Sequence, residues 1–167
     1  PPDSIVDGAI IDAEAVASAI RKALKRKSFK AVDVATSLSG NAVIVKKIAL
    51  PVMTEQELAE SIYWEAEQYI PFEIQDVNLD YLVLGTGEGQ SSMDVLLVAA
   101  KKDKISDYTG VISQAGRTAV VVDVDAFALQ NAYEANYGTD ALATVALVHV
   151  GASAVIINIL ARGQSVF

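Results

Sequence analysis

Apolar residues recur along this chain with two different spacings, and each spacing predicts one kind of element. Helical spacing, with apolar residues three and four positions apart, predicts helices over residues 12–27, 54–70, 103–115 and 125–137. Thr54 and Glu57 stand in the order of a capping box, and Pro71 is expected to end the helix that they begin. Asp12 and Asp125 are the expected N-caps of the first and last helices.

Shorter apolar runs predict strands at residues 31–38, 42–50, 78–84, 93–100, 118–124, 145–150 and 154–160. The residues "SGN" at 39–41 predict a tight turn between the first two strands, and "GTGEGQSS" at 85–92 predicts a loop between the third and fourth. The last strands form an antiparallel meander that turns again at Arg162 and Gly163 into a third strand. Together these elements predict a layered α/β or α+β protein.

Charged residues are distributed unevenly, although the net charge of the chain is −8. Residues 48–90 hold nine Asp or Glu and no Lys or Arg, whereas residues 1–47 hold eight Lys or Arg against five acids. Such asymmetry favours two structural units with different surfaces. The basic residues of the 12–27 helix could bind a phosphate surface, but they also suit a solvated face at the negative end of the helix dipole. The acidic net charge argues against nucleic acid as a partner.

Motifs for catalysis and metal binding are missing from the sequence. His149 is the only histidine, there is no cysteine, and neither G-x-S-x-G nor a glycine-rich phosphate loop of the common kinds is present. The residues "HVGAS" at 149–153 place Gly151, Ala152 and Ser153 directly after a strand. Consecutive backbone N–H groups in such a turn can cradle a phosphate. The spacing alone fits an ordinary buried hairpin better.

One aromatic residue, Trp64, lies on the side of its predicted helix that is opposite to the apolar face. Four residues of the 54–70 helix share one face and predict its buried side: Leu58, Ile62, Ala66 and Tyr69. Trp64 falls almost opposite to them, among the carboxylates of Glu57, Glu60 and Glu67. Because tryptophan is usually buried and is enriched at interfaces, Trp64 is expected to contact either a neighbouring subdomain or an external partner.

Four segments together resemble the PilM family of type IV pilus assembly proteins. They are "LPVMTEQELAESIYWEAEQYIPFEIQDVNLDYLVLG" at 50–85, "MDVLLVAAKKDKI", "VVDVDAFALQNAYE" and "VHVGASAVIINILARGQSVF". The resemblance covers almost the whole chain, and "EAEQYIPF" followed by "VNLDY" is its most specific part. This family is related to the cell-division protein FtsA and belongs to the actin-like group.

The resemblance implies an incomplete actin-like α/β first lobe with a small inserted α+β subdomain. Residues 1–45 and 120–167 would belong to the lobe, and residues 46–119 would form the insert. The family's first phosphate loop and second lobe have no counterpart in these residues, so we expect the chain to be an internal piece of a PilM-like protein.

The function implied by the resemblance is that of a cytoplasmic scaffold in the type IV pilus machine, at the inner membrane. Its main partner would be the cytoplasmic N-terminal tail of PilN, held between the lobe and the insert, and pilus motor ATPases would be further partners. ATP would bind the longer protein as a structural ligand and bind this piece weakly or not at all, without catalysis. The alternatives are an active actin-like ATPase and an FtsA-like membrane-tethered filament protein.

Two groups of site residues follow from these arguments. The phosphate-binding group is His149, Gly151, Ala152 and Ser153, and the partner-binding group is Val45, Ile48, Leu50, Trp64, Tyr69, Pro71 and Phe72. By resemblance, the position of His149 usually holds an acid or another short polar residue, and an acid there helps actin-like ATPases to place Mg²⁺. Imidazole is a poor Mg²⁺ ligand, so hydrolysis is not expected. The alternative is a histidine tucked at the strand end and hydrogen-bonded to backbone.

Overall fold

The computed structural model describes residues 3–26, 29–38, 40–86, 91–138, 142–151 and 154–166. The chain divides into two compact units. We call Pro1–Gly40 with Asp107–Phe167 the host unit, and Asn41–Ser106 the inserted unit. The expected insert was 46–119. The inserted unit ends earlier than that because the second half of one helix, α3 (Lys102–Gln114), packs within the host unit, and it begins five residues earlier, at Asn41.

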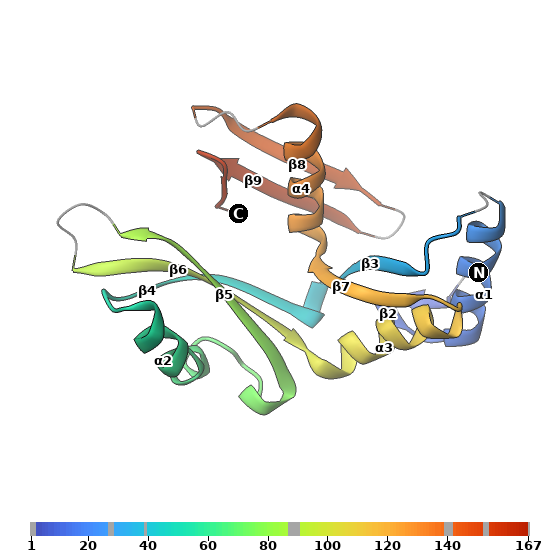
Figure 1. Ribbon diagram of the computed structural model, residues 1–167, viewed down its shortest axis with the longest axis horizontal. Coiled ribbons are helices and arrows are strands. Elements are labelled where there is room, and N and C mark those ends of the chain that lie inside the picture. The colour runs from blue at the N-terminus through green and yellow to red at the C-terminus, as the bar shows by residue number, and fades with distance from the viewer. Residues whose placement is uncertain are drawn as a thin grey trace. The chain divides into compact units, whose positions relative to one another are not determined.

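The host unit contains strands in three small sheets (Figure 1). Strands β1 (Ile5–Val6) and β2 (Ala9–Ile10) form a short hairpin, and β8 (Thr144–Val150), β9 (Val155–Ala161) and β10 (Gln164–Ser165) form the predicted antiparallel meander. The third sheet pairs β3 (Asp33–Leu38) with β7 (Thr118–Val124) in parallel. The expected tight turn at 39–41 therefore does not join paired strands, since β3 pairs with a strand far along the chain.

Two helices complete the host unit. Helix α1 (Ala13–Arg26) begins as predicted, because the Ala15 N–H donates to Asp12 Oδ1 at 2.9 Å. The buried Ala17 of this helix packs with Val111 of α3 and with Ala115, the residue that follows α3. Helix α4 (Asp125–Tyr137) has Val124 as its N-cap residue, so the expected capping role of Asp125 is wrong. The side chain of the preceding residue, Asp123, instead accepts hydrogen bonds from the Val124 N–H and from Asn131.

The inserted unit is a three-stranded antiparallel sheet with one helix on its face (Figure 1). The strand order is β4 (Val43–Pro51), β6 (Ser92–Lys101), β5 (Val77–Thr86), and the helix is α2 (Glu55–Glu67). Short 3₁₀ turns at Gly40–Ala42 and Ile74–Asp76 precede β4 and β5. Helix α2 ends three residues before the expected Ile70, because the Tyr69 and Ile70 N–H groups both bond the Ala66 carbonyl and tighten the last turn.

Strand β6 is the centre of this unit because every second side chain on it is buried. Met93, Val95, Leu97 and Ala99 pack with Leu58, Ile62 and Ala66 of α2, as the helical spacing of the sequence predicted. Residues of β4 and β5 complete the cluster on the same face of the sheet. Burial of each such aliphatic side chain stabilises the fold by about 1.5–3 kcal/mol, so this cluster holds the unit together.

The capping box of α2 is formed as predicted. The Glu57 N–H donates to Thr54 Oγ1 at 3.2 Å, and the Thr54 N–H donates to Glu57 Oε2 at 2.8 Å. The Thr54 hydroxyl also donates to Glu57 Oε2 at 2.9 Å. These hydrogen bonds, with that of the Thr54 backbone the largest cause, lower the pKa of Glu57 below its usual range.

We predict that Thr54→Ala lowers the free energy of unfolding of the inserted unit by about 1 kcal/mol, measured by urea unfolding at neutral pH. The change removes both bonds of the Thr54 hydroxyl, and the ionised carboxylate of Glu57 receives one of them. The difference from wild type should therefore shrink as the pH falls through the lowered pKa of Glu57. Thr54→Ser keeps the hydroxyl and should retain most of the stability. An equal loss of unfolding free energy in Thr54→Ala and Thr54→Ser would show that the Thr54 hydroxyl does not cap α2.

Candidate functional site

The outer face of α2 carries two exposed aromatic residues among carboxylates. The Trp64 side chain is 73% exposed, which agrees with its predicted position opposite the core, and Tyr63 beside it is also exposed. Glu60 and Glu67 lie three or four positions from both aromatic residues and are exposed as well. Aromatic groups next to carboxylates suit a ligand that combines apolar and basic side chains.

The turn after α2 contains two aromatic residues that were predicted to bind a partner, Tyr69 and Phe72, and both lie partly in the core. Tyr69 and Phe72 are half-buried against the cluster beneath α2, whereas Pro71 is exposed. Lys46 Nζ lies 5.4 Å from the centroid of the Tyr69 ring, and Lys101 Nζ lies 4.0 Å from that of Phe72. Each ring therefore already has a cation over it, and a ligand cation would have to displace that lysine to use the same ring face.

Strand β4, predicted to form a wall of the partner site with Val45, Ile48 and Leu50, offers a backbone edge. Val45 is 43% exposed, but Ile48 and Leu50 are only 4% and 2% exposed because they belong to the core. Ile48 and Leu50 can therefore contribute to such a wall through their backbone and not through their side chains. Alternate residues of a strand point to opposite faces, and these two point toward α2. In the part of the chain that the structure describes, β4 pairs with β6 alone, so its other edge has no strand beside it.

The sheet face opposite α2 is apolar at its centre. Val45 stands opposite Val98 in the register of β4 and β6, and Leu82 of β5 stands opposite Leu96. Leu82 is exposed, and Leu96 and Val98 are half-buried. A surface ion pair between Lys47 and Asp94, 2.8 Å apart, lies on the same two strands, β4 and β6. The edge of β4 is thus next to an apolar surface that a bound segment could cover.

The structure describes two of the four residues predicted to bind phosphate at the β8–β9 hairpin, His149 and Gly151. His149 is exposed, so the expectation of a histidine tucked at the strand end is wrong. The Gly151 N–H donates to the Ala154 carbonyl at 2.9 Å and is therefore not free to bind a phosphate oxygen. Ala152 and Ser153 lie outside the described residues. Val148 and Val150 are exposed too, and this end of the hairpin is less buried than its sequence suggests.

The described residues contain no helix long and apolar enough to cross a membrane. They also contain no group of three or more His, Cys, Asp or Glu side chains that could hold a metal ion.

A family model described as type IV pilus assembly protein PilM matches residues 1–167. The chain belongs to this family. The structure is similar, with a TM-score of 0.85 and 29% identity, to a chain of the PilM-PilN type IV pilus biogenesis complex, covering 100% of this chain and 50% of that one. It is also similar to the cytoplasmic domain of EpsL, an inner membrane component of the type II secretion system of Vibrio cholerae. That likeness has a TM-score of 0.58 and 14% identity, covers 89% and 55% of the two chains, and shows the fold alone.

These comparisons confirm the PilM family and the mixed α/β fold class that the sequence predicted. The description of this family places its members in type IV pilus assembly. The chain spans half the length of the PilM-PilN complex chain that it matches.

We predict that Gly151→Ala destabilises the hairpin by about 1–3 kcal/mol, because a Cβ at this position would lie 2.9 Å from the Ala154 carbonyl oxygen. Thermal unfolding and the amide NMR signals of β8 and β9 would report the loss. Gly110→Ala is the matched control, since Gly110 is within α3 and a Cβ there meets nothing within 4 Å. That change should stabilise the protein by about 0.5–1 kcal/mol. An unaltered hairpin in Gly151→Ala would contradict the close approach of Gly151 to the Ala154 carbonyl.

Proposed function

We propose that this protein is a scaffold of the type IV pilus machine that binds the cytoplasmic N-terminal tail of PilN. The observation that carries the proposal is the similarity, over the whole of this chain, to a chain of the PilM-PilN complex. The scaffold would work at the cytoplasmic face of the inner membrane, hold its partners without catalysis, and also contact the pilus motor ATPases.

The inserted unit has the features that an extended basic tail would need. The backbone groups of a bound extended peptide need partners, and the outer edge of β4 can supply them by adding the peptide as a further strand. Val45 beside this edge can contact its apolar side chains. The acids of residues 48–90 attract a basic tail as it approaches, although Lys46 and Lys101 reduce that attraction near the turn after α2.

The proposed function also includes nucleotide binding, but not by residues 1–167 alone. ATP would bind in a chain that extends beyond residues 1–167, because the Gly151 N–H is already bonded within its own turn. His149 would bring no oxygen ligand for Mg²⁺ to such a site. The role of the hairpin would then be to form one wall of a site that other segments complete.

We predict that a PilN tail peptide changes the fluorescence of Trp64, which is the only tryptophan in the chain and is largely exposed. Titration with a tryptophan-free peptide should give a saturable change in emission, and the affinity should fall as salt rises because the steering charges are exposed. Titration calorimetry of the same pair provides an independent measure of binding. The absence of binding by both methods at low salt would contradict the proposal.

The proposed contacts of Phe72 and Tyr69 with the tail peptide can be tested by truncating each side chain to alanine. We predict that Phe72→Ala weakens binding of the tail peptide by about 1–3 kcal/mol, roughly 5- to 150-fold in Kd, and mainly by a faster off-rate. Tyr69→Ala should act in the same direction. Lys25→Ala, an exposed change in the host unit, is the control and should leave the affinity unchanged. Since both rings also pack against the core, circular dichroism must show an intact fold. Binding lost only together with the fold would argue against these anchors.

Titration calorimetry with ATP tests the proposal for nucleotide binding. We predict no measurable binding of ATP with Mg²⁺ to residues 1–167 alone. Micromolar binding by this chain would show that a nucleotide site exists within these residues and that the proposed division of the site is wrong.

A further inference from the structure

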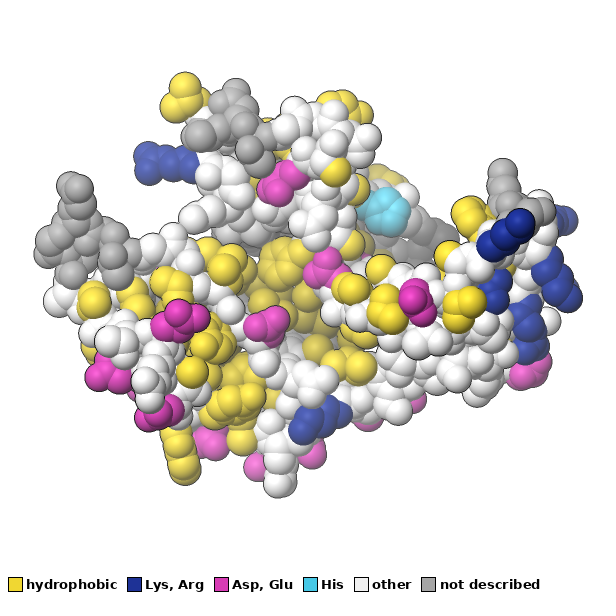
Figure 2. All heavy atoms as spheres, viewed as in Figure 1, with side chains coloured by type: hydrophobic (Ala, Val, Ile, Leu, Met, Phe, Trp, Pro, Cys, Tyr) yellow, Lys and Arg dark blue, Asp and Glu magenta, His cyan; other side chains and the backbone are white. Residues whose placement is uncertain are grey.

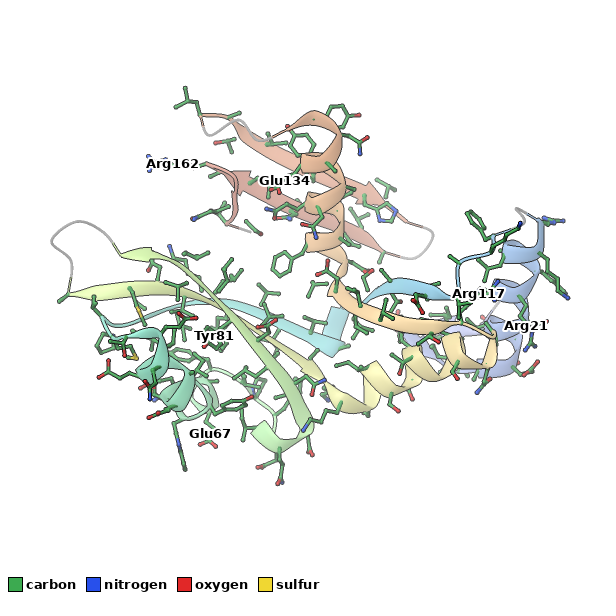
Figure 3. The ribbon with its side chains drawn as sticks, viewed as in Figure 1. Arg21, Glu67, Tyr81, Arg117, Glu134 and Arg162 are labelled. Carbon is green, nitrogen blue, oxygen red and sulfur yellow. The ribbon has the colours of Figure 1, made fainter. Side chains whose placement is uncertain are left out.

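A hollow of about 400 Å³ lies in the host unit, where residues from three parts of the chain meet. Four cationic side chains line it: Arg21 and Lys25 of α1, Lys30 after the helix, and Arg117 before β7. The other lining residues are apolar, Leu24, Phe29 and Ala115. Figure 3 shows Arg21 and Arg117 at the same end of this unit.

The concentration of positive charge here is unusual for this protein. Residues 21–30 contain six of the 13 Lys and Arg residues and no acid, in a chain whose net charge is −8. Figure 2 shows Lys and Arg side chains gathered over α1. The helix dipole accounts for cations in the last turn of α1. It does not account for Lys30 and Arg117, which lie outside the helix yet line the same hollow.

Two of these cations are fixed in place by the fold. Arg21 pairs with Glu14 and donates to the Gln114 carbonyl at 2.8 Å. Arg117 donates to the Gly116 carbonyl at 2.8 Å and to the Phe29 carbonyl at 3.3 Å, while its Nε is buried with no hydrogen-bond partner. A buried N–H without a partner is unfavourable, so the guanidinium of Arg117 still has unused capacity to donate a hydrogen bond.

The other two cations are available to a ligand. Lys25 and Lys30 are exposed, and no acid of the described residues forms an ion pair with either of them. Arg21 is balanced by Glu14, but Lys25, Lys30 and Arg117 have no carboxylate partner among the described residues. These three like charges around one hollow repel one another, so a bound anion would lower the energy of the group. Lysines on flexible stems can follow the carboxylates of a ligand, whereas the arginines hold their positions.

The apolar part of the lining restricts the kind of anion. Phe29 is 57% exposed although it lies among cations, and Leu24 is half-buried beside it in the lining. A bare phosphate would leave these apolar groups uncovered and would not fill the hollow. A ligand with carboxylates on either side of an apolar side chain would satisfy both parts of the lining. A flat membrane surface would fit a concave site poorly.

We propose that this hollow binds an acidic peptide segment of a partner protein. One apolar side chain of the segment packs on Phe29 and Leu24, and neighbouring carboxylates contact Lys25, Lys30 and Arg117. The surface is separate in its residues and opposite in charge to the one proposed for the PilN tail. The protein would thus hold two partners of opposite charge at once.

The test is an NMR titration of the ¹⁵N-labelled protein with a short peptide in which leucine and phenylalanine are flanked by glutamates. We expect saturable shifts at the amides of the residues that line the hollow, and none with the glutamine version of the peptide. Lys25→Glu should weaken binding about tenfold or more. Lys22→Glu makes the same charge change on the same helix outside the hollow and should have an effect below about twofold. Phe29→Ser should weaken binding of the peptide as well.

Three outcomes would overturn the proposal. Equal losses of affinity for the acidic peptide in Lys25→Glu and Lys22→Glu would mean that the peptide binds a diffuse positive surface and not a defined site. The same shifts with inorganic phosphate, unaffected by Phe29→Ser, would mean a site for small anions. Binding to vesicles rich in phosphatidylserine, without binding of the peptide, would mean a membrane surface. The Lys25→Glu variant should bind the PilN tail normally, so a failure here and a failure of the proposed function can be told apart.

Discussion

The parallel pairing of β3 with β7 is the constraint on which the rest of the structure depends. Parallel neighbours require the chain to leave the sheet and return from the same side, and here the whole inserted unit lies within that crossover. The register also positions the basic hollow. The Thr118 N–H donates to the Val32 carbonyl at 3.0 Å, and Arg117 directly before it reaches the Phe29 carbonyl. Residues nearly ninety positions apart in sequence therefore line one cavity.

Local signals in the sequence were sufficient for most elements. The capping box of α2, its buried face and the β5–β6 and β8–β9 hairpins are as the residues predict, because each depends on neighbours a few positions away. The short β1–β2 hairpin was missed, although its turn carries a clear signal. Asp7 and Gly8 both have positive φ, of 49° and 77°, and Asp-Gly is a preferred pair for such a turn.

Non-local pairing is what the sequence could not give. The residues at 39–41 have the composition of a tight turn, but a tight turn and a passage between two units use the same small polar residues. The same limit applies to the site. The position of β4 near a boundary predicts a wall for a partner, but which of its side chains are available depends on where α2 packs, and Ile48 and Leu50 face α2. The basic hollow needs Arg117 beside α1, and no local pattern reveals that proximity.

The order in which the strands meet their partners also has a consequence for synthesis of the chain. Every described strand of the inserted sheet has been made once Lys101 leaves the ribosome, whereas β7, the strand that pairs with β3 among the described residues, follows later. The insert can therefore fold while its host is still being translated, which reverses the usual order in which earlier segments fold first. During that interval the nascent chain carries β3 without β7 beside it, and a strand edge left open in this way can pair with other chains.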